Sequence, residues 1–279
     1  MSAAASSPPT TLPEVEASRI AWRRLGGTGP RYCLFQPTSG SSDDRLLIAV
    51  HGISRNAREQ ARLFARHAER DGVTIVAPLF EPATHGDYQR LGRVGRGGRA
   101  DHLLDEIVAE VSSNQGLASR PLRLFGFSGG GQFVHRYAMA HPDRVAAAVV
   151  SAAGWYTFPD RGLAYPYGIG APDALPGVGF DLARMLRVPV TVLVGERDHW
   201  RDPELRASRR IDSRQGNTRI DRGRRWIEAM RTAARVRGLA TPYRFELIPR
   251  CGHSFRNAVR RGGLGDRVFA LLFGGETPA

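Results

Sequence analysis

A serine between two glycines, Gly126-x-Ser128-x-Gly130, separates an apolar run at 122–125 from a segment of helical character that starts at Gln132. A strand-to-helix turn this sharp forces the serine backbone into a strained conformation, and only residues without a Cβ can crowd against it two positions away on either side. The strain lifts the hydroxyl out of the sheet. The N-terminus of the following helix also favours an oxyanion at the same point. The pattern predicts a nucleophile at Ser128.

The chain contains 32 glycines, so this pentapeptide is not specific by itself. The alternative interpretation is a tight glycine turn with an incidental serine. The two interpretations are distinguished by whether other predicted strands also end next to residues of catalytic type. The remaining partners of a hydrolytic site would be an acid, a base and a second donor to an oxyanion.

The acid is predicted at Asp198. Residues 188–194 form an apolar run typical of a strand buried on both faces, and this run leads into Gly195-x-x-Asp198. The predicted strand at 188–194 is therefore followed, at its carboxyl end, by a carboxylate side chain. Asp202 and Glu196 are the alternative acids, and the spacing after the glycine favours Asp198.

The base is predicted at His253. Residues 243–249 alternate as a strand does, and Gly252-His253 follows them. Four other histidines compete with it. His135 falls within the helix after the serine and His141 precedes a proline, so both positions are typical of structural roles. His199 adjoins the acid and would be poorly placed to reach Ser128. The fourth, His51, ends another predicted strand.

That strand, at 45–50, leads into His51-Gly52 and predicts a loop that contributes to an oxyanion hole. One donor would be the backbone N–H of Gly129, the residue after the nucleophile, and the other the N–H of Ile53. Only one glycine follows His51. The sequence therefore leaves the second donor open between Ile53 and Ser54.

Together these residues predict acyl transfer. His253 would accept the proton of Ser128, Asp198 would orient and stabilise the imidazolium, and Ser128 would attack a carbonyl to give an acyl-enzyme that water hydrolyses. The histidines show no H-E-x-x-H pattern and no cysteine pair stands close, so neither a metal nor another cofactor is expected.

The order serine, aspartate, histidine, each at the end of a separate strand, resembles the α/β-hydrolase family over about residues 31–273. The resemblance implies an α/β fold with a mostly parallel central sheet, helices on both faces and a small cap between the strands near 151 and 188. Segments 51–56 and 215–219 are similar, more narrowly, to a bacterial group of esterases distantly related to polyhydroxyalkanoate depolymerases. The implied substrate is a small-molecule or oligomeric ester.

The predicted cap, at about 154–187, is rich in aromatic residues, glycine and proline. These aromatic side chains either line an apolar substrate pocket or pack the loop onto the body of the protein, and the sequence leaves both readings open. The pocket hypothesis, with Ser54 added from the oxyanion loop, includes Ser54, Trp155, Tyr156, Phe158, Tyr165 and Tyr167.

The formal net charge is +13, and all 40 basic residues are arginine because the chain contains no lysine. This skew is typical of a GC-rich genome, and arginine is scattered along the whole chain. Its densest stretch, 201–237, predicts an amphipathic helix with a solvated basic face, and binding of an anionic partner is the alternative. Nucleic acid is not expected as a partner.

Length and composition predict one domain at 20–279 behind a disordered tail at 1–19. Cys33 and Cys251 are expected to be free thiols. The first residues lack the pattern of a secretory signal, and no run of about 18 apolar residues occurs, so a cytoplasmic protein without a membrane span is expected. The oligomeric state stays open.

The leading prediction is a serine hydrolase that cleaves a carboxylic ester through an acyl-enzyme on Ser128. One alternative keeps the fold and site and changes the reaction to carbon–carbon bond hydrolysis or perhydrolysis. Another is a non-catalytic protein that binds polyanions through its arginine surface.

Overall fold

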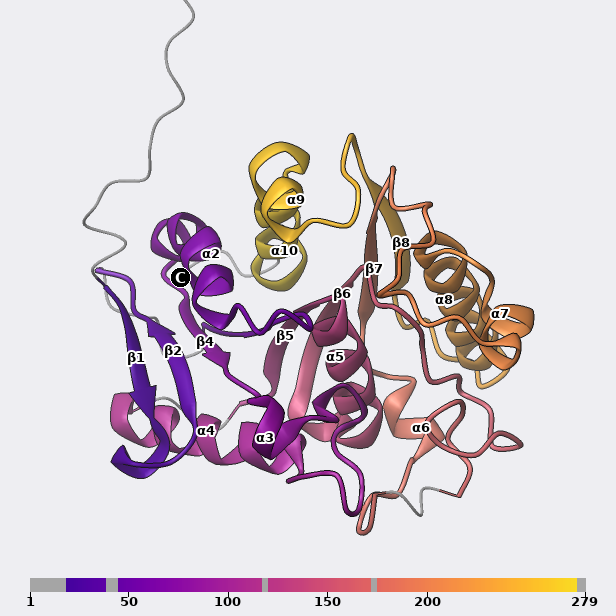
Figure 1. Ribbon diagram of the computed structural model, residues 1–279, viewed down its shortest axis with the longest axis horizontal. Helices are drawn as coiled ribbons and strands as arrows, with labels where there is room; N and C mark the ends of the chain where they lie inside the picture. Colours follow the sequence, from indigo (N-terminus) through magenta and orange to yellow (C-terminus); the bar gives the residue numbers. More distant parts are fainter. Residues whose placement is uncertain (1–18, 39–44, 117–119, 172–174, 275–279) are drawn as a thin grey trace, which may run out of the picture.

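The computed structural model describes residues 19–38, 45–116, 120–171 and 175–274. The predicted tail at 1–19 lies outside this part of the chain except for its last residue. Eight strands form one sheet in the order β1-β2-β4-β3-β5-β6-β7-β8 (Figure 1). The strands are β1 (Ile20–Arg24), β2 (Arg31–Phe35), β3 (Leu46–Val50), β4 (Thr74–Pro78), β5 (Leu122–Phe127), β6 (Val145–Ser151), β7 (Val190–Gly195) and β8 (Tyr243–Ile248).

The sheet is parallel from β4 to β8, and β1 and β2 pair antiparallel at its edge. This confirms the predicted mostly parallel sheet. Two glycines with positive φ, Gly26 (56°) and Gly27 (82°), reverse the chain between β1 and β2. The two strands therefore pair with each other at the edge of the sheet.

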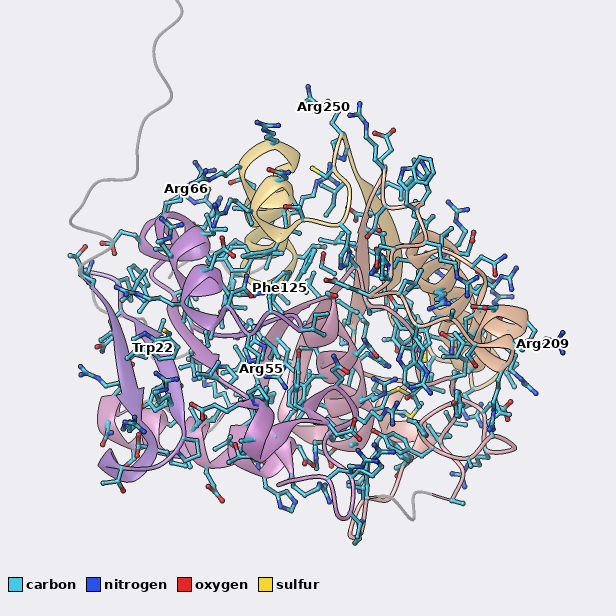
Figure 2. All side chains as sticks on the ribbon, in the orientation of Figure 1. Trp22, Arg55, Arg66, Phe125, Arg209 and Arg250 are labelled. Carbon is cyan, nitrogen blue, oxygen red and sulfur yellow. The ribbon has the colours of Figure 1, made fainter. Side chains whose placement is uncertain are left out.

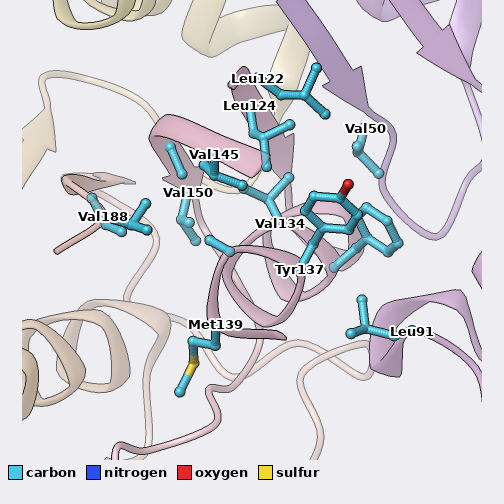
Figure 3. Packing of buried hydrophobic residues seen from close by; sticks show 14 of the residues in the cluster. Val50, Leu91, Leu122, Leu124, Val134, Tyr137, Met139, Val145, Val150 and Val188 are labelled. Carbon is cyan, nitrogen blue, oxygen red and sulfur yellow. The ribbon is translucent and has the colours of Figure 1, made fainter. Parts of the chain in front are cut away.

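Helices cover both faces of the sheet, and the strand residues alternate between two apolar cores. One core contains side chains of α4, α5, α6 and α8, and the other contains those of α2, α9 and α10, which lie together in the upper part of Figure 1. Figure 3 shows part of the first core, where Val134 and Tyr137 of α5 pack near Val50, Leu124 and Val150 of three central strands. The helices that define these layers are α2 (Ala57–Asp71), α3 (Pro82–His85), α4 (Ala100–Gln115), α5 (Gly129–Ala140), α6 (Leu182–Met185), α7 (Arg209–Gln215), α8 (Arg219–Arg235), α9 (Phe255–Gly262) and α10 (Leu264–Phe273), with short 3-10 turns η1 (Leu25–Gly27), η2 (Tyr88–Arg90) and η3 (Pro142–Arg144).

Helix α2 ends where Gly72 adopts the left-handed conformation at its carboxyl end. Helix α4 begins without a side-chain cap. Asp101 lies inside the first turn, fully buried, and its carboxylate accepts hydrogen bonds from Arg99 and from His141. His141 is therefore structural, as its position before Pro142 indicated.

The segment between β6 and β7 carries α6 and otherwise little regular structure. Many of its apolar side chains, including Tyr156, Tyr165 and Phe180, are buried in the core on the α5 face. These residues pack the segment onto the body of the protein, which is one of the two roles that the sequence left open.

The arginine-rich stretch forms two helices, and α8 has the predicted amphipathic pattern, with buried Trp226, Ile227, Met230 and Ala234 and exposed Arg224, Arg225, Arg231 and Arg235. Gly216, with φ 99° and ψ 176°, separates α7 from α8, and Thr218 with Asp221 forms a capping box at the start of α8. Arg219 and Arg222 are buried on the inner side of α8. Figure 2 shows Arg209 at the edge of the molecule on α7, so exposed and buried arginines alternate here.

In the described residues, both cysteines are free, as predicted, and both are buried. No helix there is long and apolar enough to span a bilayer. The expected cytoplasmic location stays a prediction.

Candidate active site

The turn between β5 and α5 has the strained geometry that the sequence predicted. Ser128 has φ 54° and ψ −113°, a left-handed conformation that costs a residue with a side chain of order 1–3 kcal/mol. A Cβ on Gly126 would lie 2.2 Å from the carbonyl oxygen of Gly130, and one on Gly130 would lie 2.0 Å from that of Val50. Both positions therefore require glycine, and Ser128 is held at the N-terminus of α5.

The structure brings the three predicted residues Ser128, His253 and Asp198 into one hydrogen-bonded chain. The hydroxyl of Ser128 lies 3.1 Å from Nε2 of His253, and Nδ1 of His253 lies 2.8 Å from Oδ2 of Asp198. Since Nδ1–H donates to the carboxylate, Nε2 carries the lone pair that faces the serine hydroxyl. This is the arrangement required for general-base activation of the hydroxyl.

His253 and Asp198 differ in their exposure to solvent. The Asp198 side chain is 2% exposed and that of His253 is 15% exposed. The ring of Phe127 stacks on the imidazole at a centroid distance of 5.1 Å and an interplanar angle of 30°. The imidazole is therefore fixed by an aromatic face as well as by its two hydrogen bonds.

A buried arginine contacts the other oxygen of the Asp198 carboxylate. Nη1 of Arg219 donates to Oδ1 of Asp198 at 3.1 Å, and Nη2 donates to Oδ1 of Asp202 at 3.0 Å. The hydrogen bond from Arg219 lowers the pKa of Asp202 to about 2. Asp202, the alternative acid in the sequence analysis, thus binds the arginine, while Asp198 contacts His253.

The loop after β3 lies beside Ser128. An added Cβ on Gly52 would be 3.5 Å from Cβ of Ser128, and one on Gly129 would be 3.2 Å from Cγ2 of Ile53. In the described structure, neither the N–H of Ile53 nor that of Ser54 donates to another protein group. Both N–H groups are therefore free to bind an oxyanion, and the choice between them stays open.

His51 anchors this loop. Its Nε2 accepts from the N–H of Phe80 at 3.0 Å, its Nδ1–H donates to the carbonyl of Gly52 at 2.8 Å, and its own carbonyl accepts from the hydroxyl of Tyr88. Burial lowers the pKa of His51 to about 4, so the ring is neutral at pH 7. His51 is thus a structural residue.

A cavity of about 320 Å³ opens beside Ser128 and His253. Ser54 lines it, as predicted, but Trp155, Tyr156 and Phe158 do not. Instead, polar and charged side chains line it together with three apolar ones: Asn56, Glu59, Glu204 and Arg256 with Ile53, Phe127 and Phe255. The immediate surroundings of Ser128 are therefore more polar than the pocket hypothesis expected.

The predicted pocket aromatics lie elsewhere, for a physical reason. Tyr156 is fully buried and stacked on Trp226 at 5.1 Å. Its backbone N–H donates to Oε1 of Gln215, and its carbonyl accepts from Nε2 of the same side chain. Phe158 and Tyr167 line a separate cavity of about 200 Å³. Trp155 is 4% exposed and packs against arginine side chains.

Sequence reasoning missed three contributors to the site. Phe127 was visible only as a strand residue, and Tyr88 falls in a stretch with no periodic pattern. Arg219 was noted only within a similarity to other esterases, because a buried arginine and a surface arginine look the same in sequence. In the described residues, no cluster of histidine, cysteine, aspartate and glutamate could hold a metal ion.

No family model matches the chain, and no curated protein matches it either. Solved structures do match. A poly(3-hydroxybutyrate) depolymerase from Bordetella parapertussis is 27% identical with a TM-score of 0.73, and the match covers 95% of this chain and 94% of the other. The chain has the α/β-hydrolase fold.

Further α/β-hydrolases among the matches broaden the comparison. Poly(aspartic acid) hydrolase-1 from Sphingomonas sp. KT-1 is 25% identical with a TM-score of 0.73, covering 86% of this chain and 93% of the other. An S-formylglutathione hydrolase from Agrobacterium tumefaciens is 14% identical with a TM-score of 0.57, covering 88% and 90%, and this match supports the fold alone. Because these neighbours are hydrolases, the comparisons support a hydrolase.

Proposed function

We propose that the protein is a serine hydrolase that cleaves carboxylic esters through an acyl-enzyme on Ser128. The observation that carries the proposal is the hydrogen-bonded chain from Ser128 through His253 to Asp198. The strained serine turn and the free N–H groups beside it support the same function, since a nucleophile needs both a base and an oxyanion site.

The first half of the reaction forms the acyl-enzyme. Nε2 of His253 takes the proton of Ser128 while Oγ attacks the ester carbonyl, and Asp198 stabilises the imidazolium that results. The oxyanion accepts hydrogen bonds from the N–H of Gly129 and from that of Ile53 or Ser54. Each such donor contributes about 3 kcal/mol to lowering the barrier. The imidazolium then protonates the leaving alcohol.

In the second half, His253 removes a proton from water, and the resulting hydroxide attacks the acyl carbonyl. The tetrahedral intermediate collapses, the acid is released, and Ser128 regains its proton. No step needs a cofactor. We infer that the substrate is a small-molecule or oligomeric ester, because a poly(3-hydroxybutyrate) depolymerase is among the matched structures.

The test combines covalent labelling with turnover. A fluorophosphonate probe should label the peptide that contains Ser128, and short p-nitrophenyl esters should be hydrolysed. Ser128→Ala should abolish labelling and lower kcat by at least about a thousandfold. If the folded wild-type protein neither reacts with the probe nor hydrolyses any ester, the proposal is wrong.

Substrate profiling separates this reaction from its alternatives. Carbon–carbon hydrolysis or perhydrolysis would use the same serine on other substrates, so labelling would persist while ester turnover stayed low. A non-catalytic polyanion-binding protein would bind nucleic acid with a steep salt dependence that Ser128→Ala leaves unchanged.

A further inference from the structure

Three arginines surround the indole ring of one tryptophan on the α5 face of the sheet. The guanidinium carbon of Arg136 lies 4.3 Å from the centroid of Trp155, that of Arg90 lies at 5.5 Å and that of Arg206 at 5.7 Å. We refer to Arg90, Arg136 and Arg206 as the arginine cluster. They come from η2, from α5 and from the loop before α7, so three separate elements bring like charges together at this ring.

Protein groups only partly neutralise this cluster. Arg136 is fully buried, and its Nη2 has no hydrogen-bond partner in the described structure. Burial, together with the charges of Arg90 and Arg206, lowers the pKa of Arg136 to about 10. The nearby carboxylate of Asp87 lies 3.8 Å from Arg90 but pairs more closely, at 2.9 Å, with Arg93. The cluster therefore keeps an excess of positive charge in a poorly solvated place, which an external anion would stabilise.

Arg136 is also held rigidly. Its Nε donates to the hydroxyl of Thr157 at 2.9 Å, and its Nη1 donates to the carbonyls of Gln89 and Gln132. The free Nη2 is thus fixed in place before any ligand arrives. Arg206 is exposed and the Arg90 side chain is 19% exposed, so both guanidinium groups are accessible to an anionic ligand in solvent.

Arg136 is anchored to residues that flank the turn of the nucleophile. Gln132, whose carbonyl accepts from Arg136, lies four residues after Ser128, so its Cα is about 6 Å further along the axis of α5. Gln89, the other acceptor, has its side-chain nitrogen 2.9 Å from where a Cβ on Gly129 would be. The cluster is therefore linked, through both acceptors, to the turn that carries Ser128.

The cationic surface continues beyond Trp155. The ring of Tyr167 lies 5.4 Å from that of Trp155, and Arg210 lies 4.1 Å above Tyr167. Tyr167 and Arg210 line the separate cavity of about 200 Å³, where Arg214 adds a further positive charge and Asp160 the only carboxylate of its lining. Both sides of this aromatic pair are thus rich in arginine.

We infer that the arginine cluster binds a carboxylate carried by the substrate, so that the preferred substrate is an anionic ester. This inference rests on the proposed function of Ser128. The free Nη2 of Arg136 can donate one hydrogen bond to a carboxylate, and the planar guanidinium of the exposed Arg206 can add two parallel ones, while the face of Trp155 fixes the arginines from the opposite side. The carboxylate belongs either to the acyl part or to the alcohol part of the ester.

Two matched pairs of esters test both positions. For the acyl part, mono(4-nitrophenyl) adipate is compared with 4-nitrophenyl hexanoate. For the alcohol part, 4-(butyryloxy)benzoate is compared with 4-(butyryloxy)benzamide. In at least one pair, kcat/KM for the anionic ester should exceed that for its neutral partner by about tenfold or more, after subtraction of spontaneous hydrolysis. If neither pair shows this preference, the inference is wrong.

Variants assign the preference to the cluster. The readout is the ratio of kcat/KM for the anionic ester to that for the neutral one. Arg206→Gln and Arg90→Gln should each lower this ratio by about fivefold or more, and Arg206→Lys should retain part of it. Arg209→Gln removes the same charge from an exposed site at the edge of α7 and should leave the ratio within about twofold. A loss as large in Arg209→Gln would show a general charge effect and overturn the assignment.

Competition identifies the anion. Adipate should inhibit hydrolysis of the neutral ester competitively, more weakly in Arg206→Gln than in the wild type. If inorganic phosphate competes better than adipate, the ligand is a phosphate and the carboxylate assignment is wrong. Failure of the proposed function is distinguishable from these results, because then none of the four esters is hydrolysed and the fluorophosphonate leaves Ser128 unlabelled.

Discussion

Arg219 donates a hydrogen bond to Oδ1 of Asp198 at 3.1 Å, on the carboxylate oxygen opposite the one that contacts His253. The same guanidinium binds Asp202, so one positive charge stands between two carboxylates. The charge of His253 also lowers the pKa of Asp202, after the larger effect of Arg219. The carboxylate of Asp202 is therefore close enough to His253 for the two charges to interact. Glu204, Glu59 and Arg256 line the cavity on the other side of the imidazole.

This arrangement predicts opposite pH shifts in two variants. Arg219→Gln leaves two carboxylates near His253, which favours the imidazolium, so the acidic limb of the kcat/KM profile should move to higher pH by about half a unit to one unit. Asp202→Asn removes a negative charge and should move it to lower pH. The profiles are measured on a neutral p-nitrophenyl ester.

Arg219→Lys is the matched control, since it keeps the charge and loses only the second hydrogen bond of the fork. Its profile should stay within a few tenths of a unit of the wild type. If Arg219 had a purely structural role, kcat would fall in both variants of this residue, and neither limb of the kcat/KM pH profile would move. That result would contradict the prediction.

The serine turn makes a prediction about stability. Gly130→Ala would place a Cβ 2.0 Å from a backbone oxygen of Val50 in the central sheet, and that strand cannot shift without disturbing its neighbours. We expect a loss of more than about 4 kcal/mol in the free energy of unfolding, or no folded protein. Gly179→Ala meets no atom within 4 Å and should change stability by less than about 1 kcal/mol. Urea denaturation monitored by tryptophan fluorescence measures both.

The sequence predicted the residues at the ends of parallel strands well, because each of Ser128, Asp198 and His253 follows a short apolar run whose carboxyl end must meet the same edge of the sheet. It did not predict which aromatic side chains line the cavity. Tyr156 is buried by contacts with Trp226 and Gln215, which lie far along the chain, and no local pattern encodes such contacts.

Buried histidines predict a pH-dependent stability. The pKa of His51 is lowered to about 4 and that of His135 lies well below its ordinary value, both through burial. In the unfolded chain both titrate near pH 6.5, so between about pH 6.5 and 4 the unfolded state binds more protons than the folded one. Stability should therefore be full at pH 7 and fall as the pH decreases, by about 2.5 kcal/mol per unit near pH 5. Urea midpoints at pH 7, 6 and 5 measure this slope, and equal midpoints would contradict the assigned neutral rings.

Arg222 predicts a second stability effect, one that distinguishes it from the exposed arginines of α8. It is fully buried and donates to the carbonyls of Gly154, Gly216 and Arg206 and to the carboxylate of Asp212. Arg222→Met would leave the carbonyls of Gly154 and Gly216 buried without this donor, so we expect a loss of about 3–5 kcal/mol in the free energy of unfolding.

Arg225→Met removes the same charge one turn further along α8, where the side chain is exposed and makes a single weak contact at 3.4 Å. It should change the free energy of unfolding by less than about 1 kcal/mol. Because both variants lower the net charge equally, a difference between their urea midpoints reports the buried hydrogen bonds alone. Equal losses would mean that Arg222 contributes only its charge, and that its hydrogen bond to the segment after β6 does not stabilise the folded protein.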